Sequence, residues 1–123
     1  MKTAQDPRHL HRIKTFKSLF ARDFTPQDHF TKLSQEVEEN QQEIDIIIKK
    51  AATEWPIDQI NKIDIAILRL AIYELLNKKD TPTKVIIDEA IEIAKKYGSD
   101  NSGSFINGAL ATALKLTKRN INP

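Results

Sequence analysis

The 123-residue chain contains no cysteine and has no long hydrophobic run. The absence of cysteine excludes disulfides, thiolate metal sites and cysteine nucleophiles together. The longest apolar run is interrupted by Arg69 and falls short of the ~20 residues that a membrane helix needs. The first residues also lack the apolar segment of a secretory signal peptide. We therefore expect a cytoplasmic protein that makes no use of a membrane.

Glycine and proline are also scarce, with three and five copies, and nearly all of them stand where a helix would begin or end. This distribution predicts an all-α protein, a compact bundle of about five to six helices. A chain of this length suffices for one hydrophobic core, so residues 1–123 are expected to form a single domain. The ends, residues 1–7 and 117–123, are expected to be flexible.

Hydrophobic periodicity predicts the position of each helix. A long second helix should follow the first, with Thr25 as its N-cap and Pro26 as its first residue. It should reach residue 51, and a break at the polar residues 40–42 is left open. The first helix should span residues 7–22 and bury one apolar stripe made of Leu10, Ile13, Phe16, Leu19 and Phe20.

Two further helices are expected in the middle of the chain. A short helical turn should follow Pro56, and Asp64 is the expected cap of the nearly all-apolar stretch IAILRLAIYELL. A helix that is apolar on every side belongs in the middle of a core, so this one should be the least exposed element. The next helix should begin after Thr81-Pro82 and end at Gly98, which would supply a left-handed stop.

The last helix contains two glycines. We expect Ser99 or Asp100 to cap it. Gly103 and Gly108 would lie inside it, where glycine costs up to ~1 kcal/mol relative to alanine. Close packing of another backbone against both glycines is the expected compensation.

Charge is distributed unevenly along the chain. Residues 1–22 carry a net charge of +5, whereas residues 23–123 carry −3. Such asymmetry suggests an electrostatic docking surface near the leading end. At 100° per residue the first helix should turn one broad basic side outward, with His9 nearer the apolar edge. The outward basic residues are Arg8, His11, Arg12, Lys14 and Arg22.

A basic helix face permits two interpretations. It can be an ordinary solvated surface, or it can bind nucleic acid, because fixed cations release counterions from a phosphate backbone. Single-stranded RNA would also favour side chains on which bases stack, and His9, His11 and Phe20 could serve. Composition leaves both interpretations open. The nucleic-acid interpretation requires guanidinium groups that are not locked onto the protein's own carboxylates.

The remaining polar clusters do not indicate catalysis or metal binding. His9 and His11 would point about 200° apart on a helix and cannot share a metal ion there. Asp88, Glu89 and Glu92 are interpreted as a solvated helix face. Glycine-rich phosphate loops and nucleophile elbows are absent from the sequence. We therefore expect a protein that is not an enzyme and has no cofactor.

Two segments of the second half carry a specific resemblance. They are WPIDQINKIDIAILRLAIYELL and TPTKVIIDEAIEIAKKYGSDNSGSFINGAL. The Trp-Pro pair, the acidic residue before Ile-Leu-Arg-Leu, the Tyr-Glu-Leu ending and the later Phe-Ile-Asn-Gly resemble the NusB family of bacterial transcription antitermination factors. The resemblance covers about residues 36–114.

The resemblance implies a NusB-like all-α bundle and a set of partners. Proteins of this family bind single-stranded boxA RNA together with the ribosomal protein NusE, and join RNA polymerase in an antitermination complex. A homodimer is also left open. With the basic face, the resemblance implies RNA-binding residues Arg8, His9, Arg12, Lys14, Lys17, Phe20, Asn101 and Ser102. It implies a protein-partner surface at Asp64, Arg69 and Glu74.

The chain also departs from the family pattern. The arginine-rich segment is diluted, with His9, Leu10 and Ile13 where Arg or Glu is common. The connection between residues 22 and 30 is short, so one family helix after the first should be missing. Two alternatives follow: a protein-only adaptor that has lost RNA binding, and a stand-alone relative of the RNA-binding domain of rRNA methyltransferases. The chain has no room for a methyltransferase domain and lacks the cysteine of that family.

Overall fold

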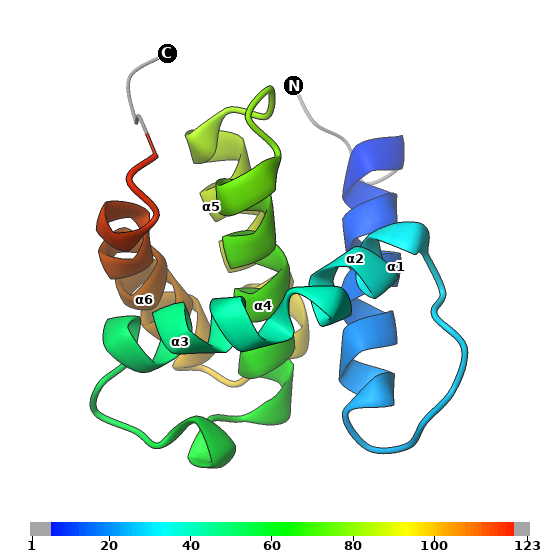
Figure 1. Ribbon diagram of the computed structural model, residues 1–123, viewed down its shortest axis with the longest axis horizontal. Coiled ribbons are helices and arrows are strands. Elements are labelled where there is room, and N and C mark those ends of the chain that lie inside the picture. The colour runs from blue at the N-terminus through cyan, green and yellow to red at the C-terminus, as the bar shows by residue number, and fades with distance from the viewer. Residues whose placement is uncertain (1–5, 120–123) are drawn as a thin grey trace.

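The computed structural model describes residues 6–119 and is drawn in Figure 1. Within this range the chain forms six α-helices, one short 3₁₀ helix and no strand, so the all-α prediction is confirmed. None of the described helices is long and apolar enough to cross a membrane. The elements are α1 (Pro7–Arg22), α2 (Lys32–Glu39), α3 (Gln41–Ala51), η1 (Ile57–Gln59), α4 (Lys62–Asn77), α5 (Thr83–Tyr97) and α6 (Ser102–Leu116).

Helix α4 lies at the centre of the bundle. Eleven of its sixteen residues are buried, and it contacts all five of the other α-helices. Figure 1 shows it upright between α1 on one side and α6 on the other. Its sequence is apolar nearly all round because every side of it meets another helix. The prediction that this helix is the least exposed element is confirmed.

Helix α1 lies alongside α5 and runs in the same direction. Near its beginning, His9 Nδ1 lies 3.0 Å from Glu89 Oε1 of α5, and two turns later the ring centroids of Phe16 and Tyr97 are 5.5 Å apart. Phe16 is buried as predicted, but Leu10 is 48% exposed. The prediction for Leu10 is wrong because its position lies on the side of α1 that faces solvent.

The connection between α1 and α2 contains no helix, so the predicted start at Thr25-Pro26 is wrong. The true N-cap of α2 is Thr31, whose Oγ1 accepts the backbone N–H of Ser34 at 3.0 Å. The N–H of Phe30 donates to the buried Ser18 Oγ of α1 at 2.9 Å. These contacts hold the connection against α1 and delay the helix until its first residue can be capped.

The expected long helix is divided in two at Asn40, which answers the question that the sequence left open. Asn40 is both the C-cap of α2 and the N-cap of α3. Its Nδ2 donates to the carbonyl of Glu36 at 2.8 Å. The break lets α2 face α1 while α3 packs on α6.

The turn between α5 and α6 depends on the missing side chain of Gly98 rather than on a left-handed backbone. Gly98 has φ −92° and ψ −167°, so the predicted left-handed stop is wrong. A Cβ placed on Gly98 would lie 2.7 Å from the carbonyl oxygen of Ala94 and collide with Ser102. Glycine is therefore required by space.

Two N-caps also differ from prediction. Helix α4 is capped by Asn61, and Asp64 instead lies in its first turn. Helix α6 begins after Asn101 without a side-chain cap, so neither Ser99 nor Asp100 has that role. Instead, the Oγ of Ser102, the first residue of α6, accepts the N–H of Ser99 at 2.9 Å and stabilises the turn before the helix.

Parts of both predicted flexible ends are held in place. Residues 1–5 and 120–123 lie outside the described residues. Asp6 caps α1 by accepting the N–H of Arg8 at 2.9 Å. Arg119 donates to the carbonyls of Leu75 at 3.0 Å and Lys78 at 3.1 Å, and also to that of Thr81. These contacts tie Asp6 and Arg119 to the rest of the protein, and the flexibility of the two ends stays a prediction.

Candidate nucleic-acid interface

The guanidinium of Arg12 is buried between α1, α4 and α5. Its side chain is only 10% exposed. Nη2 lies 2.9 Å from Glu74 Oε1, Nε lies 3.0 Å from Glu74 Oε2, and Nη1 lies 3.3 Å from Glu89 Oε1. Burial lowers the pKa of Arg12, but the hydrogen bonds and charges of Glu74 and Glu89 outweigh it and leave the pKa above its ordinary value. The prediction that Arg12 points outward is wrong.

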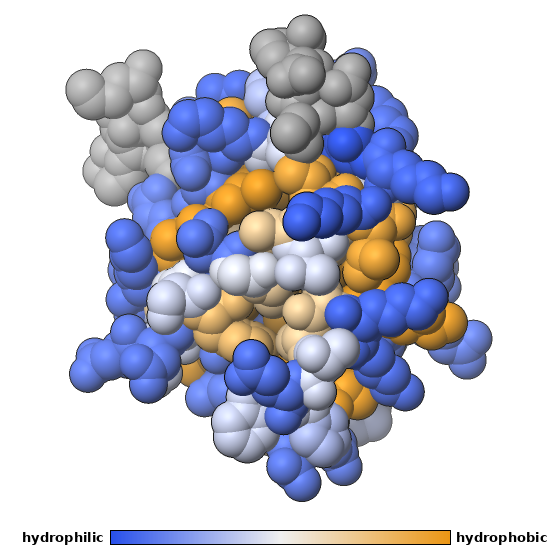
Figure 2. Space-filling model, turned by 90° about the vertical axis from the view of Figure 1, so that its left-hand side faces the viewer, coloured by the Kyte–Doolittle hydropathy of each residue, from blue (hydrophilic) through white to orange (hydrophobic). Residues whose placement is uncertain are grey.

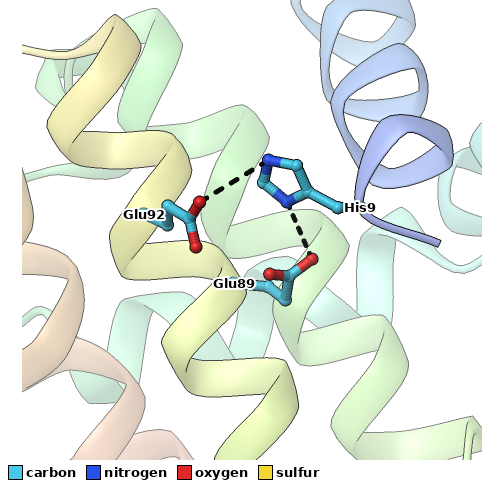
Figure 3. A group of neighbouring side chains, drawn as sticks. All are labelled: His9, Glu89 and Glu92. Atoms are coloured by element: carbon cyan, nitrogen blue, oxygen red, sulfur yellow. Dashed lines mark hydrogen bonds and ion pairs between the residues drawn. The ribbon is translucent and has the colours of Figure 1, made fainter. Parts of the chain in front are cut away.

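His9 belongs to the same buried cluster (Figure 3). Its Nδ1 lies 3.0 Å from Glu89 Oε1, and its Nε2 lies 3.7 Å from Glu92 Oε1. Glu89 is buried and therefore is not part of a solvated helix face, as the sequence had suggested. Asp88 is exposed, in line with that interpretation, and pairs with Lys84 at 2.8 Å.

The potential ligand atoms of His9, Glu89 and Glu92 lie within 4.8 Å of one another, which is close enough for the three side chains to be considered as ligands of one metal ion. The two ring nitrogens face different carboxylates, so one ion could bind only one nitrogen. Glu89 Oε1 also accepts a hydrogen bond from Arg12 Nη1, which a metal ion would have to displace. The cluster is better described as an ion-paired joint between helices than as a metal site.

The charges of this joint are buried, so each of them needs a partner of opposite charge. A charged side chain in the interior is tolerated when it is paired and hydrogen-bonded. Arg12 satisfies the carboxylates of α4 and α5 at once, and this fixes the rotation and height of α1 against them. Neither His9 nor Arg12 can reach RNA from this position without breaking the joint, so their role as direct contacts stays a prediction that this arrangement does not support.

The other two arginines of α1 have different surroundings. Arg22 donates to Glu38 of α2 at 2.6 and 2.7 Å, and this contact raises the pKa of Arg22 and lowers the pKa of Glu38. Arg8 has a side chain that is 85% exposed and lies 3.3 Å from Asp6. Of the three arginines, only Arg8 presents its guanidinium to solvent.

Residues 14–22 of α1 include two exposed lysines, Lys14 and Lys17. Lys17 Nζ lies 5.3 Å from the ring centroid of Tyr97, and Lys96 Nζ lies 5.4 Å from the same centroid. A tyrosine ring with two ammonium groups at this distance is a cation–π arrangement. We call Lys14, Lys17, Lys96 and Tyr97 the lysine–tyrosine face.

Aromatic side chains continue from this face to the end of α1. The ring of Phe20 lies 6.3 Å from Phe16 and 5.0 Å from Phe24, measured between centroids. Phe20 is half-buried, whereas Phe24 is 62% exposed. Phe20 can therefore offer only part of its ring to a ligand, and Phe24 is an exposed aromatic outside the predicted set of RNA-binding residues.

Asn101 and Ser102 were predicted as a pair, but they have opposite surroundings. Asn101 is exposed, whereas Ser102 is 1% exposed. Ser102 Oγ accepts the N–H of Ser99 at 2.9 Å, and this stabilises the turn before α6. The hydroxyl of Ser102 is used inside the protein, and a direct contact of Ser102 with RNA stays a prediction.

Asp64 of α4 lies next to the turn that precedes α6. Burial raises its pKa, and a hydrogen bond with the Ser102 side chain lowers it in part. Oδ1 of Asp64 is buried without a hydrogen-bond partner. Asp64 is only 7% exposed, and its contact with a protein partner stays a prediction.

The other two predicted partner residues, Glu74 and Arg69, form ion pairs with residues of the same chain. Glu74 is buried against Arg12. Arg69 has a side chain that is 12% exposed and lies 2.9 Å from Asp45 and 3.6 Å from Asp23. Arg69 does line a cleft of about 510 Å³, so it is the one member of the set that a partner could approach.

Sequence reasoning missed Lys96 and Tyr97 as members of a site. In the sequence, Tyr97 falls at the helical spacing of apolar residues, and Lys96 stands near a helix C-terminus, where a cation is favourable. Their joint position becomes visible only when α1 and α5 are placed side by side. The sequence does contain a hint, a Lys-Lys-Tyr run before the turn that leads to Asn101.

A family model described as the NusB family matches residues 8–115. A transcription antitermination protein NusB from Clostridium novyi is 41% identical over 87 residues, covering 71% of this chain and 65% of the relative. One from Acetivibrio thermocellus is 51% identical over 77 residues, covering 63% and 53%. One from Clostridium botulinum strain Kyoto is 38% identical over 110 residues, covering 89% and 76%. The matched part thus spans less than two thirds of the first two relatives.

Solved structures show the same architecture. NusB of T. maritima superposes with a TM-score of 0.82 at 36% identity, covering 94% of this chain and 93% of that one. A chain in the crystal structure of a plectonemic RNA supercoil superposes with a TM-score of 0.78 at 24% identity, covering 89% and 94%. At that lower identity the likeness shows the fold alone.

Proposed function

Because the chain belongs to the NusB family, we propose that it is a transcription antitermination factor that binds single-stranded boxA-like RNA together with the ribosomal protein NusE. It would act in the cytoplasm as one NusB-like domain, within an RNA polymerase antitermination complex. Its contribution would be binding rather than catalysis. The names of the curated relatives support the antitermination role.

The lysine–tyrosine face is the observation that carries the RNA-binding proposal. Lys17 and Lys96 come from different helices and converge on Tyr97. Ammonium groups attract phosphates with an affinity that falls as salt rises. An aromatic ring beside them can accept an unstacked base. Asn101 follows Tyr97 by four residues and is exposed, so it can extend this face with an amide.

The buried joint of Arg12, His9 and Glu89 supports the proposal indirectly. It holds α1 against α5, and Lys17 reaches Tyr97 only if the two helices keep that alignment. In this proposal the direct RNA contacts are therefore Lys14, Lys17 and Asn101, with Arg8 and Phe20 at the margins. His9 and Arg12 act as scaffold.

The test is a salt series with a fluorescein-labelled, boxA-like single-stranded RNA and a scrambled RNA of equal length, followed by anisotropy. We expect tighter binding of the boxA-like RNA and a fall in affinity as salt rises. Replacing Lys17 and Lys96 together with alanine should weaken binding at least tenfold. Lys79→Ala, at an exposed position between α4 and α5, is the matched control. Equal, salt-insensitive binding of both RNAs would refute the proposal.

The ribosomal protein NusE is proposed as a partner only because the chain belongs to the NusB family. Of the predicted partner residues, Arg69 reaches a cleft, so we place the contact at this cleft. A pull-down with purified NusE, followed by RNA titration of the captured complex, tests both partners in order. Light scattering of the free chain in the same experiment would test the homodimer.

A second candidate function has an observation of its own. All three guanidinium groups of α1 are paired with carboxylates, although the Arg8 pair is exposed, and this is the arrangement expected of a protein-only adaptor that has lost RNA binding. Capture of NusE with no RNA binding, before or after capture, would favour the adaptor.

A further inference from the structure

A second cleft, of about 480 Å³, lies between the segment that follows α3 and the outer side of α6. Trp55 forms one wall and is 55% exposed, and Ser104, Gly108 and Thr112 lie along α6 in the lining. Figure 2 shows this side of the molecule, with pale and light-orange atoms gathered at its centre and hydrophilic atoms around them. We call this hollow the Trp55 cleft.

Gly108 is the residue that most needs an explanation. It lies inside α6, where glycine costs stability relative to alanine because its backbone has more freedom to lose. A Cβ placed on Gly108 would meet nothing within 4 Å, so the close packing predicted from the sequence is wrong within this chain. A Cβ on Gly103 would contact only the side chain of Lys95, at 3.4 Å, so the predicted close packing of another backbone is wrong at Gly103 as well. The cost of Gly108 is explained if a group outside the chain approaches this point of α6.

The chemistry of the lining suits a nucleobase. Trp55 is an exposed aromatic ring on which a base can stack. Ser104 and Thr112 donate their hydroxyls to helix carbonyls, which leaves their oxygens able to accept from a base. The side chain of Asn101 does not cap α6, so its amide can both donate and accept.

The surroundings suit a single strand that continues from the lysine–tyrosine face. Lys49 and Lys50 are exposed in the last turn of α3, directly before the residues that line the cleft. Their charge is complementary to phosphates. Asn101 lines the cleft and also follows Tyr97 in the turn after α5. A strand that touches Tyr97 can therefore pass Asn101 and enter the cleft.

Building on the proposed function, we propose that the Trp55 cleft binds an unpaired nucleobase of the bound RNA, stacked on Trp55 and lying over Gly108. The site is distinct from the lysine–tyrosine face, since it contributes a base contact rather than phosphate contacts. Stacking on Trp55 would raise the affinity for single strands that carry an intact base at the position that enters the cleft.

The first test uses tryptophan fluorescence, because Trp55 is the only tryptophan of the chain. Titration with the boxA-like RNA should quench the emission to a saturating level at the concentration where anisotropy saturates. An RNA of equal length with abasic nucleotides should bind more weakly and leave the emission nearly unchanged. Binding of the intact RNA without quenching would overturn the proposal.

The second test separates a binding role of Gly108 from a structural one. Gly108→Ala should raise the Tm by a few degrees, because alanine favours the helix, and should weaken RNA binding about fivefold or more. A variant that is more stable yet binds less cannot be explained by misfolding. Asn107→Ala is the matched control, at an exposed α6 position outside the cleft. Gly108→Ala with unchanged RNA affinity would overturn the proposal.

The outcomes also separate this inference from the proposed function. If RNA binds in a manner that depends on Lys17 and Lys96, but Trp55 and Gly108 make no difference, the cleft proposal fails and the function stands. If no RNA binds, both fail. If Trp55 emission responds to purified NusE and not to RNA, the cleft is a protein contact and the nucleobase proposal is refuted.

Discussion

The two halves of α1, residues 7–13 and 14–22, carry similar positive charge but present it differently. In the first half, Arg12 and His9 are buried against carboxylates of α4 and α5. In the second half, Lys14 and Lys17 are exposed, and Lys17 lies over the ring of Tyr97. The first half therefore determines where the helix sits, and the second half determines what the surface can attract.

This difference teaches that the sign of a side chain's charge does not reveal the role of that side chain. Burial of an ion pair is costly, and removal of one partner leaves the other charge uncompensated. An exposed ammonium group has little effect on stability but acts over a Debye length of about 8–10 Å. Changes to the buried residues of the first half should therefore alter stability, and changes to the exposed lysines of the second half should alter RNA binding.

The largest effect is expected from Arg12→Ala. It leaves Glu74 and Glu89 buried without their guanidinium, and removal of one partner from a buried pair costs about 3–5 kcal/mol. Urea unfolding measures the loss, and Arg12→Lys is the milder variant if the alanine variant fails to fold. Arg8→Ala is the control, because its side chain is 85% exposed. A fully stable Arg12→Ala variant that loses RNA binding would erase the contrast between the two halves.

Lys14→Ala should show the opposite pattern. Its free energy of unfolding should stay within about 0.5 kcal/mol of the unchanged protein, as for exposed surface sites. RNA affinity should fall about threefold, and the slope of log affinity against log salt should lose about one unit if Lys14 neutralises one phosphate. Unfolding and anisotropy on the same preparation check both statements. A large loss of stability would show that the second half is structural too.

The smallest effect concerns Glu38, the partner of Arg22 at the end of α1. The hydrogen bond from Arg22 lowers the pKa of Glu38 in the folded state. A depressed carboxyl pKa contributes stability that is present above the unfolded pKa, near 4.5, and is lost as pH falls through the folded value. Because the pair is partly exposed, the contribution should be well under 1 kcal/mol.

Glu38→Gln should therefore reduce stability slightly at pH 7 and flatten its dependence on pH below about 4.5. Thermal unfolding between pH 3 and pH 7 measures this against the unchanged protein. An identical pH profile for both proteins would show that the Arg22 contact has no energetic role.

Much of the fold could be predicted because the signals are local. The boundaries of α1 were predicted to the residue, and the all-apolar sequence of α4 indicated its central position. The start of α2 could not be predicted from Thr25-Pro26, because Thr31 is chosen as cap by contacts with α1 that are distant in sequence. The break at Asn40 depends in the same way on where α2 and α3 must pack.

The candidate site was less predictable than the fold. Lys14, Lys17 and Asn101 were selected from the sequence and are exposed. His9, Arg12 and Ser102 were selected with them and are buried. The resemblance to a family can indicate which positions matter, but it cannot distinguish a residue that touches a ligand from one that holds such a residue in place.

By itself, the sequence determined the helical class, the family and the excess of positive charge near the leading end, because periodicity, motif spacing and composition are properties of a linear chain. Only the tertiary structure decided which cations are available. That depends on Glu74 and Glu89, which lie more than sixty positions from Arg12. A charge is neutralised by what lies within a few ångströms of it in space, and this distance exists only after α1, α4 and α5 have packed together.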